Sequence, residues 1–307
     1  MRQFQGGFII NFQPIRLADK PLFDSFLRKR RYENAHFSFT NLFMWRSGFQ
    51  VEWALLGEHL CIRAAWDGEH YILPPFGVPD QGMGDALDRL AEHFAAQGWP
   101  LVIRGAEAFM TEELNALRPG LLRWEADEDN FDYVYNTQDL IDLSGRKYHS
   151  KKNHLNSFKR SYSDYSYVPL TPDLVPACLE VAQNWWLQQP DSEDVSLKLE
   201  QQAIADALGN MEYLGLNGGA ILLSGQVAAF TFGERLNEDT AVVHVEKGNP
   251  EIRGVFTAIN QEYCRNTWTH IPYVNREEDM GIPGLRKAKQ SYHPVTMIKK
   301  YVGTLQK

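Results

Sequence analysis

The stretch Tyr273–Tyr301, YVNREEDMGIPGLRKAKQSYHPVTMIKKY, contains an acidic cluster, a glycine turn and a cationic segment in succession. Pro283 suits the first turn of a helix, and Pro294 disfavours helical geometry at the residue before it, so we expect a helix from about 283 to 292. From Met280 to the C-terminus there is no carboxylate, although the chain has a net charge of −8. Any single cation here is explained by a solvated surface, but the whole stretch favours an anionic ligand.

A second basic stretch, GRKYHSKKNHLNSFKR at 145–160, lies in the middle of the chain and also lacks acidic residues. Tyr148, Leu155 and Phe158 recur at helical spacing and predict one apolar seam, whereas Lys152 lies on another side. We expect a basic helix at this position that links two domains. We also expect the two basic stretches to converge, so that Lys151, Lys152, Arg286 and Lys289 line one groove and nearby carboxylates offset their charge.

Length and composition limit the class of protein. A chain of 307 residues suits two domains, and a hydrophobic share of 44% with 8 Trp, 13 Tyr and 17 Phe predicts filled cores. The acidic net charge argues against a general nucleic-acid coat. The three cysteines are far apart and have no metal-site spacing, which indicates a reducing compartment. No apolar run approaches the roughly 20 residues of a membrane helix, so we expect a cytoplasmic protein. His149, His154 and His293 also show no metal-site spacing, so we expect no metal.

The predicted elements occur twice in the same order. The first set is expected at 12–17 (strand), 20–30 (helix), 51–73 (three short strands with turns at Gly57-Glu58 and Asp67-Gly68), 83–97 (helix), 101–103 (strand), 108–117 (helix), 121–124 and 131–135 (strands). The second set is expected at 165–170 (strand), 172–189 and 197–208 (helices), 211–245 (three strands) and 255–265 (helix). This repetition predicts two α+β domains of one fold. The segment 190–194 between two helices is expected to be a mobile loop that gates a site.

The two basic stretches together resemble the soluble catalytic part of bacterial phosphatidylglycerol lysyltransferases and the stand-alone proteins grouped with it. The segments FSFTNLFMWR at 37–46 and HVEK at 244–247 fit the same group. The resemblance implies two tandem GNAT (acetyltransferase-type) domains, each a mixed, mainly antiparallel sheet flanked by helices, as in Fem-type aminoacyltransferases. Those enzymes move an amino acid from an aminoacyl-tRNA to an amine or hydroxyl. We expect an N-terminal domain at 1–143, a basic linking helix at 144–164, and a C-terminal domain at 165–307 with the active site.

The resemblance places the acyl donor where the central strands part, between the strand that ends at Glu246 and the helix that follows. The intervening loop holds Arg253 and Gly254, and a helix N-terminus offers free amide groups to an anion. The usual pyrophosphate loop has Gln or Arg and a second small residue where this chain has Glu251 and Phe256. Because a carboxylate would repel pyrophosphate, we expect aminoacyl-tRNA rather than coenzyme A as donor.

Three carboxylates are candidates for the site. Glu246 is the expected general base for an incoming amine or hydroxyl, and the alternative is an ion pair with Lys247 or with a cation of the C-terminal helix. Glu277 and Asp279 are candidates to hold the α-ammonium of an amino acid, or alternatively to pair with Arg276.

The cations and the remaining polar residues complete the expected site. Lys299 is an expected catalytic cation, and Arg286, Lys289 and Lys300 are candidates for phosphate contacts or oxyanion stabilisation. Tyr292 is a candidate proton donor to a leaving hydroxyl, or else a core residue on an apolar stripe. The other substrate-binding candidates are polar residues of the two basic stretches: Lys151, Lys152, Asn153, Asn275.

We therefore expect a transferase that passes an aminoacyl group from the acceptor end of an aminoacyl-tRNA to an amine or hydroxyl of a small molecule, peptide or lipid headgroup. One alternative is a coenzyme-A-dependent N-acyltransferase, which differs in the donor alone. The other is a non-catalytic binding module for an anionic metabolite. Binding of acetyl-CoA compared with aminoacyl-adenosine analogues distinguishes these hypotheses.

Overall fold

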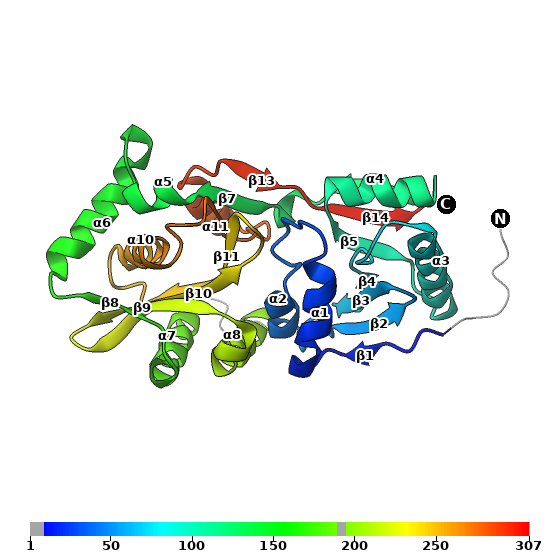
Figure 1. Ribbon diagram of the computed structural model, residues 1–307. Helices are drawn as coiled ribbons and strands as arrows, with labels where there is room; N and C mark the ends of the chain where they lie inside the picture. The colour runs from blue at the N-terminus through cyan, green and yellow to red at the C-terminus, as the bar shows by residue number, and fades with distance from the viewer. Residues whose placement is uncertain (1–8, 189–194, 307) are drawn as a thin grey trace. The chain divides into compact units, whose positions relative to one another are not determined.

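The computed structural model describes residues 9–188 and 195–306, with the side chains of 195–197 left out of the description. The chain divides into two compact units, Met1–Phe131 with Ile298–Lys307, and Asp132–Met297. The described residues form two seven-stranded sheets, one belonging to each unit (Figure 1). The segment 190–194, predicted to be a gating loop, lies outside the described residues.

The first sheet has the strand order β1-β2-β3-β4-β5-β14-β6. Its strands are β1 (Gln13–Pro14), β2 (Glu52–Leu56), β3 (His59–Trp66), β4 (Glu69–Ile72), β5 (Val102–Ala106), β14 (Tyr301–Leu305) and β6 (Leu122–Ala126). β4 and β5 are parallel, and the other neighbours are antiparallel. The predicted turn between β3 and β4 is present, because Asp67 and Gly68 adopt the positive φ values of 48° and 78° that a tight hairpin requires.

Helices cover both faces of the first sheet. They are α1 (Lys20–Leu27), α2 (Phe39–Met44), α3 (Gln81–Ala96) and α4 (Ala108–Leu117). On β2 the side chains of Trp53 and Ala54 alternate between the two faces. Trp53 meets Phe23 of α1 edge-on at 5.7 Å, whereas Ala54 belongs to the core that includes Leu90 and Phe94 of α3.

The second sheet has the order β13-β7-β12-β11-β10-β9-β8. Its strands are β13 (Thr296–Ile298), β7 (Asp132–Asn136), β12 (Tyr273–Asn275), β11 (Thr240–Gly248), β10 (Gln226–Arg235), β9 (Asn217–Leu223) and β8 (Ser166–Pro169). β11 and β12 run parallel. The pairs β7–β12, β10–β11, β9–β10 and β8–β9 are antiparallel. Both sheets are thus mixed and mainly antiparallel, and the predicted α+β fold class is confirmed.

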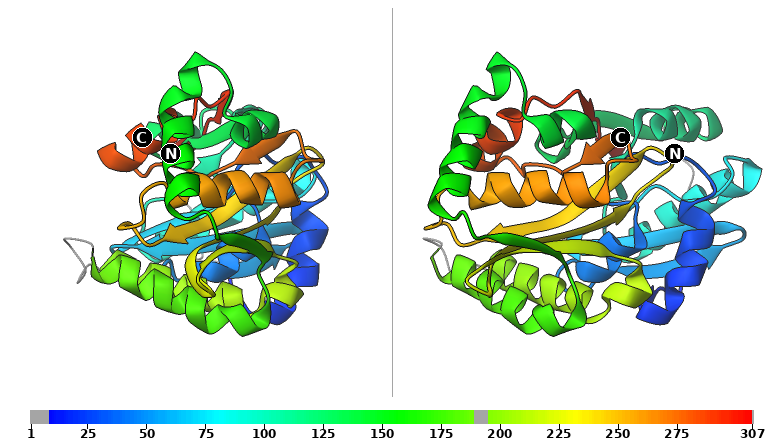
Figure 2. Two further views of the ribbon diagram at one scale, coloured as in Figure 1. Left: turned by 90° about the vertical axis from the view of Figure 1, so that its left-hand side faces the viewer. Right: turned by 60° about the vertical axis from the view of Figure 1, so that its left-hand side comes forward.

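In the second unit, α10 lies on one face of the sheet, and α7 and α8 lie on the other (Figures 1 and 2). The helices are α5 (Thr137–Asp142), α6 (His149–Ser161), α7 (Val175–Leu187), α8 (Val195–Gly209), α9 (Met211–Leu214), α10 (Val255–Thr267) and α11 (Pro283–Gln290). The core between α10 and the sheet contains Ile259 and Tyr263 of α10 and Val243 of β11. The basic helix α6 contributes Leu155 and Phe158 to this core, as its predicted apolar seam requires.

The two units exchange strands, which changes the expected boundaries at 143 and 165. β7, expected in the first domain, pairs with β12 in the second sheet. β14, expected in the second domain, lies between β5 and β6 in the first sheet. The expected linking helix is part of the second core. Strand propensity marks these segments as strands, but it does not tell which sheet receives them, because that depends on pairing partners far away in sequence.

Candidate active site where β11 and β12 part

The parallel strands β11 and β12 pair over three residues and then separate. Their last pair is Val242 with Asn275, after which β12 ends while β11 continues to Gly248. The register with β10 shifts at this point, because Gly233 pairs with Val243 and Phe232 with Val245. His244 is left as the extra residue of a β-bulge, which bends β11 at the position where the two strands part.

Arg276 and Glu246 face each other across this gap between the strands. Nη2 of Arg276 donates a hydrogen bond to Oε1 of Glu246 at 3.1 Å, and both side chains are 13% exposed. The second oxygen of Glu246, Oε2, accepts a hydrogen bond from Nδ2 of Asn260 on α10 at 3.2 Å. The partner of Glu246 is therefore Arg276. Lys247, the alternative partner considered from the sequence, pairs instead with Glu200 at 2.9 Å.

Two buried polar atoms beside Glu246 have no hydrogen-bond partner among the described residues. They are Nη1 of Arg276 and Oδ1 of Asn260. Each belongs to the same planar group as the nitrogen that donates to Glu246. An unpaired buried polar atom costs about 1–3 kcal/mol, and a polar ligand that pairs with both atoms would remove this cost.

Tyr292 and Lys151 form the other side of the arrangement. The ring of Tyr292 lies under the Lys151 ammonium at 4.0 Å and under the Arg276 guanidinium at 4.8 Å. The Tyr292 side chain is buried, its hydroxyl donates to Oγ1 of Thr257 at 3.4 Å, and burial raises its pKa. Burial and the charge of Arg276 together lower the pKa of Lys151 to about 8, against an opposing contribution from Glu246. A substantial fraction of Lys151 is therefore neutral near pH 8.

Lys289 fixes the chain that carries Arg276. Its ammonium donates to the carbonyl oxygen of Glu277 at 3.0 Å and also to the carbonyl oxygens of Arg276 and Glu278. Burial lowers the pKa of Lys289 to about 8. Lys289 was a candidate for phosphate contacts, but its hydrogen bonds are committed to three successive carbonyl groups. It therefore positions Arg276.

His244 holds the same chain segment from the sheet side. Its ring nitrogens lie 2.9 Å from Oε1 of Glu277 and 3.1 Å from Oε1 of Glu234. The side chain is 1% exposed. Burial alone would lower the pKa of His244, but the hydrogen bonds to the two carboxylates raise it to about 9. The imidazolium thus bridges β10, β11 and the segment after β12, and Glu277 is engaged here rather than with Arg276.

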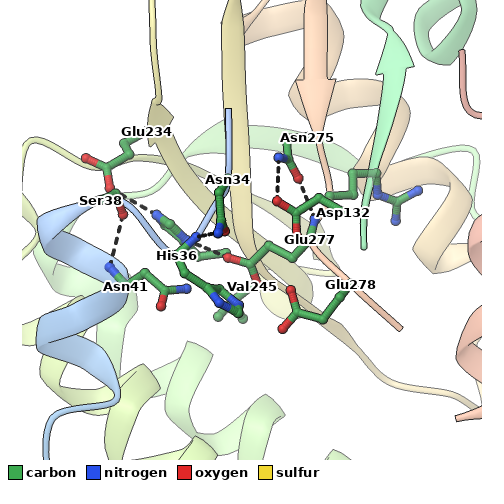
Figure 3. Close-up of polar contacts among 12 residues, drawn as sticks. Asn34, His36, Ser38, Asn41, Asp132, Glu234, Val245, Asn275, Glu277 and Glu278 are labelled. Carbon is green, nitrogen blue, oxygen red and sulfur yellow. Dashed lines mark hydrogen bonds and ion pairs between the residues drawn. The ribbon is translucent and has the colours of Figure 1, made fainter. Parts of the chain in front are cut away.

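Three further candidates, Asp279, Arg286 and Asn275, take part in polar contacts within the second unit. Asp279, 1% exposed, accepts from Nε and Nη2 of Arg286 at 2.9 Å each and from the Tyr133 hydroxyl at 2.5 Å. Hydrogen bonds from Arg286 and Tyr133 lower the pKa of Asp279, although burial opposes this effect. Asn275 is fully buried and donates to Oδ2 of Asp132 at 3.0 Å (Figure 3). These contacts stabilise the segment between β12 and α11.

Two of the remaining cations, Lys299 and Lys300, belong to the first unit, whereas the other candidates belong to the second. The expected C-terminal domain at 165–307 is corrected accordingly, because the second unit ends at Met297. Lys299 is exposed, whereas Lys300 is buried and lies 3.4 Å from the ring of His36. Lys152 and Asn153 are exposed on α6.

The expected convergence of the two basic stretches occurs within the second unit. Tyr148 donates from its hydroxyl to the carbonyl oxygen of Tyr292 at 3.1 Å, and His293 contacts the Lys147 carbonyl at 3.0 Å. Of the four cations expected in one groove, Lys151 lies against the ring of Tyr292 and Lys289 donates to the carbonyl oxygen of Arg276. Arg286 pairs with Asp279 instead, and Lys152 is exposed.

The predicted donor loop has a packing role. Gly254 adopts φ +86° immediately before α10, and a Cβ atom there would lie 2.3 Å from the carbonyl oxygen of His154 on α6. Glycine is thus required for the close approach of α10 and α6. The His154 oxygen also lies against the N-terminus of α10, where an anion would otherwise bind. Arg253 is exposed.

Sequence reasoning found Glu246, Arg276, Tyr292 and Lys151 but missed Asn260. Asn260 lies in the middle of a helix predicted from its apolar spacing, and a polar residue there is usually a surface residue. It is 1% exposed.

Within the described ranges no helix is long and apolar enough to cross a membrane.

The family model described as "Phosphatidylglycerol lysyltransferase, C-terminal" matches residues 28–303. The chain belongs to this family, which places it among enzymes of the aminoacyltransferase kind and confirms the resemblance seen in the sequence.

Solved structures and a curated relative are also similar to this chain. A conserved protein of unknown function from Bacteroides thetaiotaomicron is 35% identical, with a TM-score of 0.89 over 97% of this chain and 100% of that chain. L-PGS from Bacillus licheniformis shares the fold at 11% identity, with a TM-score of 0.64 over 94% and 92% of the two chains. An uncharacterized protein of Mycoplasmoides gallisepticum is 25% identical over 176 residues. That match spans 57% of this chain and 56% of the curated relative.

Proposed function

We propose that this protein transfers an aminoacyl group from an aminoacyl-tRNA to an amine or hydroxyl of a small-molecule, peptide or lipid-headgroup acceptor. The observation that carries the proposal is the pairing of a base with an anion-binding group at one place. Lys151, with its pKa lowered to about 8, shares the Tyr292 ring with Arg276, whose Nη1 is unpaired among the described residues. Acyl transfer from an ester needs both groups.

In the proposed reaction, neutral Lys151 accepts a proton from the attacking amine or hydroxyl. The new bond forms between the acceptor atom and the ester carbonyl carbon, and Nη1 of Arg276 donates to the oxyanion that develops on the carbonyl oxygen. The ester C–O bond then breaks, and the ribose hydroxyl leaves with the proton returned from Lys151. Glu246 orients Arg276 and balances its charge.

Tyr292 has a supporting role in this proposal rather than that of proton donor. Its pKa is raised by burial, which makes the hydroxyl a weaker acid, and the hydroxyl faces Thr257. Its ring contacts both cations, Lys151 and Arg276.

The geometry of the donor loop supports aminoacyl-tRNA over coenzyme A. Gly254 serves the contact with His154, and Glu251 carries a negative charge where pyrophosphate would bind. The test is calorimetric titration with an amide-linked aminoacyl-adenosine, which mimics the tRNA end and is not hydrolysed, and in parallel with acetyl-CoA. We expect saturable binding of the aminoacyl-adenosine and weak or no binding of acetyl-CoA. The reverse result would favour the coenzyme-A-dependent alternative.

A further inference from the structure

The carboxylate of Glu246 lies between one unpaired donor and one unpaired acceptor. Nη1 of Arg276 shares a guanidinium with the Nη2 that donates to Oε1, and Oδ1 of Asn260 shares an amide with the Nδ2 that donates to Oε2. Neither atom has a partner elsewhere in the part of the chain that is described. The amide of Asn260 cannot be reversed to solve this, because its oxygen would then face the carboxylate.

The unpaired atoms define the chemistry of a ligand. Arg276 requires a hydrogen-bond acceptor, whereas Asn260 requires a donor, and the carboxylate of Glu246 beside them favours a donor with positive charge. Acceptor and donor must also be close together in the ligand. An α-aminoacyl ester meets these conditions, because its carbonyl oxygen and its ammonium nitrogen are carried by adjacent carbon atoms.

We infer that Glu246 and Asn260 form a subsite for the α-ammonium group of the donor, while Arg276 binds the carbonyl oxygen of the same aminoacyl group. This inference rests on the proposed function and adds a selectivity to it. The subsite makes the protein selective for α-aminoacyl donors over acyl donors that lack the α-amino group. A simple acyl group leaves Asn260 without its partner and places a methylene against Glu246, and a site built for a polar group rejects such an analogue strongly.

The test uses two matched pairs of amide-linked adenosine analogues. The first pair is the alanyl derivative and its deamino counterpart, the propionyl derivative. The second pair is the lysyl derivative and the 6-aminohexanoyl derivative, which keeps the distal ammonium and loses the α-ammonium alone. Dissociation constants are measured for the wild type, for Asn260→Leu and for the control Asn266→Ala. Asn266 is exposed near the C-terminal end of the same helix, α10.

In at least one pair, the wild type and the control are expected to bind the analogue with the α-amino group at least tenfold more tightly than the analogue without it. Asn260→Leu is expected to reduce this ratio toward one, whereas a merely structural defect would weaken both members of a pair equally. Equal binding of both members by the wild type would overturn the subsite while the proposed function stands. The same conclusion would follow if Asn260→Leu kept the full ratio. Failure of all four analogues to bind would overturn the proposed function as well.

Discussion

Nη2 of Arg276 donates to Oε1 of Glu246 at 3.1 Å, and this contact joins β11 to the segment after β12 just beyond their last paired residues. The bulge at His244 bends β11, and Lys289 holds the carbonyl groups of the opposite segment. The pair is therefore fixed from both sides. A preorganised guanidinium of this kind can stabilise an oxyanion without rearranging during the reaction.

The pair itself makes a testable contribution to stability. Both side chains are 13% exposed, so Arg276→Met leaves a largely buried carboxylate without its cation. We expect a loss of about 3–5 kcal/mol in the free energy of unfolding, measured by urea denaturation. The double variant Arg276→Met/Glu246→Leu should lose less than Arg276→Met alone, since no buried charge remains. Strictly additive losses would contradict a direct interaction.

The activity should depend on the protonation of Lys151. Because its pKa is lowered to about 8, the neutral fraction rises with pH, and the transfer rate should rise about tenfold per pH unit below that value and level off above it. Lys151→Arg keeps the charge but cannot lose it, so we expect a loss of about 10²–10⁴ in rate together with the loss of this pH dependence.

The measurement is the rate of loss of labelled aminoacyl-tRNA, corrected for uncatalysed hydrolysis at each pH. Lys287→Arg, at an exposed position of α11, is the matched control and should keep the wild-type profile. A Lys151→Arg protein with an unchanged pH profile would exclude Lys151 as the proton acceptor.

His244 should stabilise the fold in a pH-dependent way. Its pKa is raised from 6.5 to about 9 in the folded chain, so its contribution is complete below about pH 6.5 and is lost as the pH rises through 9. The substitution His244→Gln should therefore cost more stability at about pH 6 than at about pH 9.5. Denaturant unfolding at both pH values measures this, with the exposed His149→Gln as control. An equal cost at both values would show that the imidazole is neutral.

The strand exchange predicts the result of cutting the chain between 143 and 146. The sequence alone suggested two compact pieces, but the N-terminal piece keeps β7, which pairs with β12, and the C-terminal piece keeps β14, which pairs with β5 and β6. We expect the nicked halves to stay together in size-exclusion chromatography. Halves produced separately should be poorly folded until they are mixed. Two independently stable halves would contradict the exchange.

The sequence predicted the fold class well because apolar spacing and turn residues act locally. The seam Tyr148, Leu155 and Phe158 identified α6, and Asp67 with Gly68 identified a hairpin. The boundaries were wrong because strand pairing is a long-range property. Lys299 and Lys300 were assigned to the second domain for the same reason, since they lie next to β14 in the chain.

The candidate site was predicted in part. Glu246 lies near the end of β11 and Arg276 directly follows β12, and polar residues that follow an apolar run are recognisable in the sequence. Their pairing was missed because Glu277 and Asp279 are closer to Arg276 in sequence, and the bulge at His244 that brings Glu246 within reach leaves no signal in the sequence.

The most direct test of the account is a comparison of donors at the Arg276–Glu246 site. Total tRNA charged with labelled amino acids, and labelled acetyl-CoA, are each incubated with the wild type and with Lys151→Arg, using ethanolamine as a probe acceptor that offers an amine and a hydroxyl. The account predicts that the wild type transfers label from one or more aminoacyl-tRNAs and little from acetyl-CoA, and that Lys151→Arg transfers neither. Transfer from acetyl-CoA alone, or transfer from aminoacyl-tRNA that Lys151→Arg leaves unchanged, would contradict it.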